Sequence, residues 1–348
     1  MHLCALSFSL PLLSLLCHSP QLAVSSMAIS EEKDGDMTSK SVSLKPVTKV
    51  AVSGGTSGNK LAGVYLAKKW LKDPSELQRQ TFNATPFLVN PRAAKAMVRF
   101  TEKDINTCFL ESILSAPDTE DTPYEEKRAK EINLIFGPKG SPNPYDLLLD
   151  MHSTPSNMGV TIILDNAENY LGMHLAHYVQ NNFPFLKTHI YLSMVPKNTS
   201  GKITSIVRCG ITLEIGPVNV ETLTADAFNY TQNLVKCCLD FTDKFNQGVT
   251  FPAFETEAYQ YFGLQDYPID ADREMSAMVH RKLQGKDYLP QKPGDPILLS
   301  FDGKTIPYNG DRAVYPIFIN DPAMTSKKAA FVKTDKLKFS IPAIRARK

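Results

Sequence analysis

Three short segments of this 348-residue chain place polar side chains where they could do chemistry. The first is a glycine-rich segment, Ser53–Gly63, which contains Lys60. The second has His152 directly after an apolar run, with Asp150 two residues before it. The third has Glu214 within an apolar run that ends in Gly-Pro. A carboxylate is costly to bury alone, so Glu214 requires a partner.

Each of these segments follows or ends a predicted strand. The chain alternates between strand-like and helix-like patterns up to about residue 248, which predicts an α/β fold with a largely parallel sheet. Ligands of such sheets collect at the carboxyl ends of the strands, where the three segments would meet. The predicted strands are 47–52, 85–89, 147–151, 160–164 and 211–215, and the predicted helices are 61–72, 124–136, 169–181 and 224–245.

The two ends of the chain differ in character from its middle. Residues 249–348 are rich in proline and carry short strand candidates at 296–299, 304–308, 313–319 and 336–339, which predicts a smaller β-rich domain. Residues 1–45 form an extension whose apolar run, 3–17, is too short for a membrane span. That run is either a secretory signal or lies upstream of a true start at Met27 or Met37.

Charge is nearly balanced, with 38 Lys+Arg against 36 Asp+Glu, which argues against a nucleic-acid-binding protein. The glycine-rich segment also fails as a phosphate-binding P-loop, because Asn59 separates Gly58 from Lys60 and Leu61 follows the lysine. A small-molecule site in an α/β domain is the remaining prediction.

Several separated motifs occur in the order found in the aspartoacylase and succinylglutamate desuccinylase family, from about residue 46 to about residue 340. The branch that the chain resembles most is the third aminoacylase, through segments 251–259 and 314–320. The resemblance implies a zinc-carboxypeptidase-like mixed sheet with helices on both faces, residues 46–248, and a smaller C-terminal β-rich domain, residues 249–348. The motifs are Gly-Gly-Thr-x-Gly-Asn at 54–59, Asn-Pro-Arg at 90–92, Asp-Ile-Asn at 104–106, Asp-Met-His at 150–152 and Glu-Ile-Gly-Pro at 214–217.

The resemblance also implies a zinc-dependent hydrolase that cleaves N-acyl, in particular N-acyl aromatic, L-amino acids. His152 stands at a zinc-ligand position, and Asp150 stands at the position of the residue that supports this histidine. Glu214 stands at the general-base position, Arg99 where a side chain polarises the scissile carbonyl, and Asn106 in the substrate site. The implied partners are a small N-acyl amino acid and further copies or paralogues in a homo- or hetero-oligomer. The implied compartment is the cytoplasm, with membrane association or secretion as alternatives and no membrane-spanning segment.

The chain departs from the family at the residues that matter most. Ser57 and Lys60 occupy the other two zinc-ligand positions, where the family has His and Glu. Thr107 replaces the arginine that grips the substrate carboxylate, and Met324 replaces a tyrosine. Because an ammonium repels a divalent cation, we expect zinc binding to be impaired or lost. We predict that Lys60 contacts both Glu214 and His152.

Two functions therefore stay open. The chain is either a zinc amidohydrolase with a rebuilt metal site, for which Glu102 or Asp104 would supply replacement ligands, or an inactive family member that acts as a binding or hetero-oligomer partner. Structural roles are the alternatives for single residues. His152 could be a hydrogen-bonded histidine kept by Asp150, Glu214 with Lys60 a buried ion pair, and Arg99 an ion-pair partner.

Overall fold

The computed structural model describes residues 41–347. The predictions for the apolar run at 3–17 and for the start at Met27 or Met37 lie outside these residues. Within the described part, no helix is both long enough and apolar enough to span a membrane.

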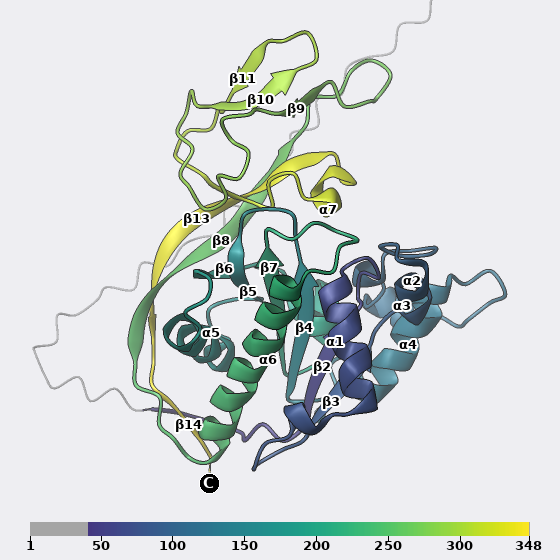
Figure 1. Cartoon of the computed structure of the whole chain (residues 1–348), viewed down its shortest axis with the longest axis vertical. Helices are drawn as coiled ribbons and strands as arrows, with labels where there is room; N and C mark the ends of the chain where they lie inside the picture. Colours follow the sequence, from purple (N-terminus) through teal and green to yellow (C-terminus); the bar gives the residue numbers. More distant parts are fainter. Residues whose placement is uncertain (1–40, 348) are drawn as a thin grey trace, which may run out of the picture. The chain divides into compact units, whose positions relative to one another are not determined.

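A nine-stranded mixed sheet forms the centre of the fold (Figure 1). Its four strands β3, β2, β4 and β7 are mutually parallel, β5 is antiparallel to β7, and β6 and β8 continue the sheet beyond β5. The order is β12-β13-β8-β6-β5-β7-β4-β2-β3. The strands are β2 (Val50–Gly54), β3 (Ala84–Leu88), β4 (Leu147–Ser153), β5 (Gly159–Leu164), β6 (Thr188–Leu192), β7 (Cys209–Gly216), β8 (Phe254–Asp266), β12 (Tyr315–Ile317) and β13 (Ala329–Ile341).

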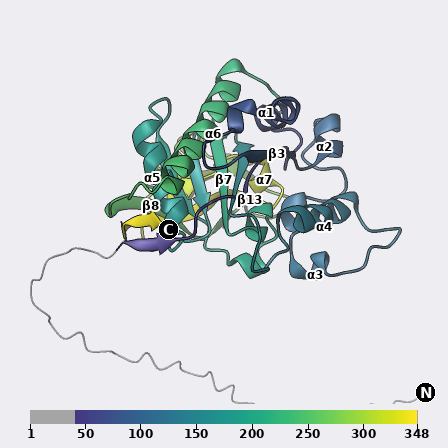
Figure 2. The same cartoon turned by 90° about the horizontal axis from the view of Figure 1, so that it is seen from below.

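Helices cover both faces of this sheet, as the resemblance implied. Figure 2 shows α1, α5 and α6 on one side of the strands and α3 and α4 on the other. The first side holds the larger hydrophobic core, which includes Trp70 and Phe241, and the second holds a smaller one around Phe109 and Phe136. The helices are α1 (Leu61–Lys72), α2 (Pro91–Ala96), α3 (Glu111–Leu114), α4 (Tyr124–Phe136), α5 (Tyr170–Asn182), α6 (Ala225–Asn246) and α7 (Pro322–Thr325).

The C-terminal region is β-rich but differs from the predicted set of short strands. Strands β8 and β13 have 13 residues each and pair with each other along their whole length. Through β6 they join the central sheet, so the sheet continues past the predicted boundary at residue 248. A separate three-stranded sheet, β9 (Ala277–Val279), β10 (Pro296–Ser300) and β11 (Thr305–Pro307), covers its own small core, and β1 (Val42–Leu44) pairs with β14 (Ile344–Ala346). The exact domain border stays a prediction.

One face of the sheet carries the polar residues singled out above. Because side chains alternate along a strand, Asp150 and His152 on β4 share a face with Thr212 and Glu214 on β7. The register supports this, since Asp150 lies opposite Thr212 and His152 lies opposite Glu214. The opposite face of the same strands is apolar and packs beneath α1, α5 and α6.

Candidate functional site

The glycine-rich segment is a tight connection between β2 and α1. It needs glycine because other backbone lies very close: a Cβ on Gly58 would be 2.1 Å from the carbonyl carbon of Ala93, and one on Gly54 would be 2.1 Å from the oxygen of Gly63. The amide of Gly58 also donates to the carbonyl of Arg99 at 3.2 Å. These contacts fix the loop so that Lys60, the residue before α1, points back across the sheet edge toward β4 and β7.

A buried aspartate anchors the centre of the site. Asp150 accepts hydrogen bonds from the hydroxyls of Ser53, at 2.7 Å, and Thr56, at 2.8 Å. Its other oxygen lies 2.7 Å from Nε2 of His152. Burial by itself would raise the pKa of the Asp150 carboxyl, but the histidine and the two hydroxyls outweigh it, so the pKa is lowered. Asp150 is therefore a fixed anion that orients His152.

The ammonium of Lys60 lies between the histidine and the glutamate, as the sequence predicted. Nζ of Lys60 is 3.1 Å from Oε1 of Glu214 and 3.3 Å from Nδ1 of His152. Lysine can only donate, so Nδ1 accepts and Nε2 carries the proton that His152 donates to Asp150. Lys60 is 8% exposed and Glu214 is 3% exposed. The four side chains form one continuous, buried chain of hydrogen bonds.

Ser57 lies in the same loop and is buried, but its hydroxyl has no hydrogen-bond partner among the described residues. Most buried hydroxyls are bonded, so the Ser57 hydroxyl is an exception in this loop. Across residues 41–347, no three His, Cys, Asp or Glu side chains converge as a metal site would require.

The structure does not bring the predicted substrate residues into the Lys60 cluster. The guanidinium of Arg99 binds Asp104 through Nε, at 3.1 Å, and Nη2, at 2.7 Å, as in the structural alternative. The same aspartate caps the 3-10 turn η2 (Ile105–Thr107) by accepting from the amide of Asn106, and the Thr107 hydroxyl donates to its carbonyl. Met324, on α7, packs against a cluster of tyrosines and aliphatic side chains.

The proposed replacement ligands are engaged elsewhere. Glu102 accepts from the amide of Tyr124 at 3.0 Å and lies 3.7 Å from Arg92. Asp104 is held by Arg99. Neither carboxylate makes a described contact with His152.

Sequence reasoning missed Lys202, which immediately precedes the 3-10 turn η4 (Ile203–Ile206). It lines a small cavity together with Thr212, which shares a face of the sheet with Glu214. The surrounding segment is rich in Ser, Thr and Gly, which is typical of an ordinary loop. Only the folded path of the chain across the sheet shows where Lys202 lies.

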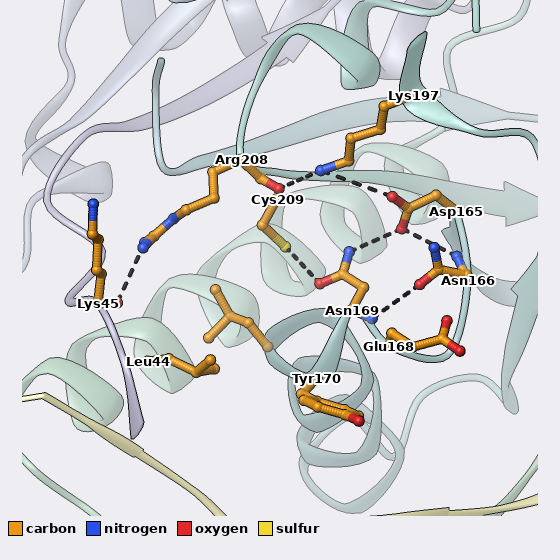
Figure 3. A pocket seen from close by; sticks show the side chains of 11 residues that line it. Leu44, Lys45, Asp165, Asn166, Glu168, Asn169, Tyr170, Lys197, Arg208 and Cys209 are labelled. Carbon is orange, nitrogen blue, oxygen red and sulfur yellow. Dashed lines mark hydrogen bonds and ion pairs between the residues drawn. The ribbon is translucent and has the colours of Figure 1, made fainter. Parts of the chain in front are cut away.

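A cavity of about 340 Å³ lies at the opposite end of β7, next to Cys209 (Figure 3). Some of its polar groups are paired with one another: Lys197 lies 3.8 Å from Asp165, and the Cys209 thiol donates to Asn169 at 3.3 Å. Cys209 and Glu214 are five residues apart on one strand, about 17 Å at the usual rise. This cavity is therefore distinct from the Lys60 cluster.

The fold and the position of the cluster define a carboxypeptidase-like α/β protein with its site at the carboxyl ends of β2, β4 and β7. The model of the succinylglutamate desuccinylase/aspartoacylase catalytic domain matches residues 46–242. The model of the AstE/AspA barrel-sandwich hybrid domain matches residues 254–336. The chain belongs to the succinylglutamate desuccinylase/aspartoacylase family.

Relatives within this family are similar over nearly their whole length. The rat N-acyl-aromatic-L-amino acid amidohydrolase (carboxylate-forming) is 42% identical over 302 residues, covering 87% of this chain and 95% of the relative. Mouse aspartoacylase is 40% identical, covering 88% and 98%. The crystal structure of murine aminoacylase 3 matches with a TM-score of 0.83 at 41% identity, covering 86% of this chain and 99% of that chain.

Proposed function

We propose that this chain is a family member that has exchanged its zinc for the ammonium of Lys60, that does not hydrolyse amides, and that binds N-acyl amino acids. The observation that carries the proposal is the position of Nζ of Lys60, within 3.3 Å of both His152 and Glu214. The class of ligand is argued from the relatives, which include an N-acyl-aromatic-L-amino acid amidohydrolase.

The residues present do not fit a zinc ion. A structural or catalytic zinc needs at least three protein ligands, and Ser57 and Lys60 replace two of them. Two unit charges at 4 Å interact by about 4 kcal/mol near a protein surface, so a divalent ion would be repelled by Lys60 by about 8 kcal/mol. His152 would have to hold the ion nearly alone, because its neighbour Asp150 is bonded to the imidazole and to two hydroxyls.

The glutamate is also unsuited to act as a general base. Its Oε1 accepts from Lys60 at 3.1 Å in a buried ion pair, so this oxygen already faces the ammonium and not a water molecule. Lys60 at a zinc-ligand position and Glu214 at the general-base position therefore form one buried ion pair.

The test is an amide hydrolysis assay with N-acetyl-L-tyrosine in the presence of added zinc, with murine aminoacylase 3 as the positive control. We expect no free tyrosine above the buffer background at an enzyme concentration at which the control hydrolyses all of the substrate. Turnover within tenfold of the control would contradict the proposal.

A zinc amidohydrolase with a rebuilt site is the second candidate, favoured by the 42% identity to the rat amidohydrolase. It requires Glu102 or Asp104 to leave Arg92 or Arg99 and turn toward His152. Metal-dependent turnover that is lost in Glu102→Gln or Asp104→Asn would support it.

Oligomerisation with itself or with an active paralogue, and a cytoplasmic location, stay predictions. Size-exclusion chromatography with light scattering, of the chain alone and mixed with murine aminoacylase 3, measures the first directly. Fractionation of cells that express the full chain measures the second.

A further inference from the structure

The cavity beside Cys209 lies at the carboxyl ends of two other strands of the central sheet. Strands β5 and β6 are parallel to each other, and β5 is antiparallel to β7, so the carboxyl end of β5 meets the amino end of β7. Helix α5 connects β5 to β6 and completes a β-α-β unit. Ligands of such units bind outside the carboxyl ends of the strands. The mixed sheet therefore has a second edge suited to a ligand, opposite the edge that holds the Lys60 cluster.

One wall of this cavity is held together by contacts between its own side chains. The side-chain oxygen of Asn169 accepts from the amide of Gly172 at 3.0 Å and from the Cys209 thiol at 3.3 Å. The side-chain nitrogen of Asn169 donates to Asp165 at 3.3 Å. Lys197 lies 3.8 Å from the other oxygen of the same carboxylate. The charges of Asp165 and Lys197 therefore offset each other, and this wall is formed without a ligand.

Three other charged side chains of the cavity keep bonding capacity that no residue in the range 41–347 uses. The Arg208 guanidinium bonds through Nη2 to the carbonyls of Lys45 and Pro46. The same nitrogen lies 3.3 Å from Asp146, so Nε and Nη1 stay without a described partner. The ammonium of Lys45 and the carboxylate of Glu168 are exposed and form no ion pair within the described part of the chain.

These three charges are separated by sign across the cavity. Figure 3 shows Lys45 and Arg208 on one side and Glu168 on the other. Lys45 and Arg208 stay together because the guanidinium is bonded to the backbone of Lys45, at 3.3 Å. Glu168 belongs to the loop between β5 and α5, which lies away from them. A ligand that spans the cavity therefore meets positive charge at one end and negative charge at the other.

Apolar side chains line the cavity as well. Leu44, Leu171 and the ring of Tyr170 contribute to its surface and pack against the larger hydrophobic core. The volume of about 340 Å³ falls at the lower end of the range typical of small-molecule sites, roughly 300–1,000 Å³. A ligand that fits is small, has apolar groups, and carries opposite charges at its two ends.

We propose that this cavity binds a short zwitterionic peptide with apolar side chains. The carboxylate of the peptide lies beside Lys45 and Arg208, and its ammonium lies beside Glu168. A dipeptide has the required separation of charges, whereas a free amino acid carries both charges on one carbon and cannot reach both sides. An N-acyl amino acid lacks the ammonium. The inference is therefore independent of the proposed function, which concerns the Lys60 cluster at the other edge of the sheet.

Isothermal titration calorimetry with three probes tests each end of the ligand separately. The probes are L-leucyl-L-leucine, its N-acetyl derivative, which lacks the ammonium, and its C-terminal amide, which lacks the carboxylate. Wild type should bind the free dipeptide about fivefold more tightly than either blocked form, the effect of one ion pair at a partly exposed site.

Two substitutions assign the ends of the peptide to the two sides of the cavity. Glu168→Gln should weaken binding of the free dipeptide about fivefold and leave binding of the N-acetyl form unchanged. Lys45→Gln should weaken binding of the free dipeptide severalfold, because Arg208 remains, and leave binding of the amide unchanged. Both side chains are exposed, so the thermal melt should match wild type. Glu120→Gln and Lys72→Gln, at exposed residues outside the cavity, are the matched controls.

Equal binding of the three probes by wild type, or no binding of the free dipeptide at millimolar concentration, would overturn the inference. An affinity for the free dipeptide that neither Glu168→Gln nor Lys45→Gln changes would also overturn it. N-acetyl-L-tyrosine separates this outcome from a failure of the proposed function. If the dipeptide binds with the expected variant effects and N-acetyl-L-tyrosine does not bind, the second site stands and the proposed function is wrong. If the reverse holds, only the second site is wrong.

Discussion

Two lysines approach the same face of the sheet in very different surroundings. Lys60 is enclosed by groups that match it, with a carboxylate at 3.1 Å and an imidazole nitrogen at 3.3 Å. Lys202 is held in place by its backbone, but its amine has no partner among the described residues. Removing one partner of a buried ion pair is costly because it leaves a buried charge alone, whereas a lysine without a partner already bears part of that cost in the folded state. The two regions therefore differ in how the charge of a lysine is compensated.

Rebuilding the metal position should produce the largest effect. We expect the double variant Ser57→His with Lys60→Glu to bind zinc near-stoichiometrically, in contrast to the wild-type chain. The two new side chains would join His152 as the second and third protein ligands of the ion. Zinc affinity is measured by competition with a chromogenic chelator.

Ser57→His alone is the matched control, since it leaves the ammonium in place and should gain little. Equal zinc binding by the single and double variants would show that the ammonium of Lys60 does not prevent zinc binding.

Breaking the Lys60 ion pair should cost about 3–5 kcal/mol of unfolding free energy, because each single change leaves one buried charge alone. Lys60→Met strands the Glu214 carboxylate, and Glu214→Gln strands the ammonium. Urea denaturation measures the change. Glu257→Gln is the control, as it removes the surface pair with Lys336, at 2.6 Å, and should cost far less than the loss of the buried pair. A loss at Lys60 as small as this control would contradict the comparison.

Asp287 tests, for an anion, how strongly burial destabilises the charged form of a side chain. Burial raises the pKa of its carboxyl to about 6, although it accepts from the amides of Asn157 and Ile319, and Asp321 adds repulsion. Between pH 3.8 and about 6 the folded state holds more protons than the unfolded state, so the unfolding free energy falls as pH rises. The contribution is about 3 kcal/mol. We expect Asp287→Asn to remove that part of the pH slope, measured by urea denaturation from pH 4 to 7; an unchanged slope would refute it.

Removing Lys202 should have the smallest effect and the opposite sign to Lys60→Met. Its lowered pKa means that the unfolded state takes up the proton more readily, so Lys202 destabilises the fold at neutral pH, and this effect disappears as pH approaches 10.5. Lys202→Met should therefore stabilise the protein at pH 7 by on the order of 1 kcal/mol. The gain should shrink at pH 10. Destabilisation at pH 7 would indicate a structural partner for the amine.

Much of the fold was readable from local patterns. Helices α1 and α4 begin and end at the predicted residues, because their apolar spacing and flanking Pro and Gly are strong local signals. Strand β8 was missed, since its 13 residues mix charged and aromatic side chains and depend on pairing with β13. Such pairing is set by contacts far apart in sequence.

The contacts of the site likewise divide into those that motifs predicted and those that join segments far apart in the sequence. The contact of Lys60 with Glu214 and His152 followed from motif positions in one family. The pairing of Arg99 with Asp104 was weighed only as an alternative, and the approach of Gly201 to Thr107 was invisible, because it joins segments about ninety residues apart. A lysine in a polar loop carries no local signal that it will reach a buried cavity.

The most direct measurement of the central claim is the metal content of the purified wild-type chain after dialysis against zinc and then against metal-free buffer, by inductively coupled plasma mass spectrometry. The account predicts that zinc is essentially absent, because the ammonium of Lys60, 3.3 Å from His152, would repel an ion bound to that histidine. Close to one zinc per chain, retained through dialysis, would contradict it.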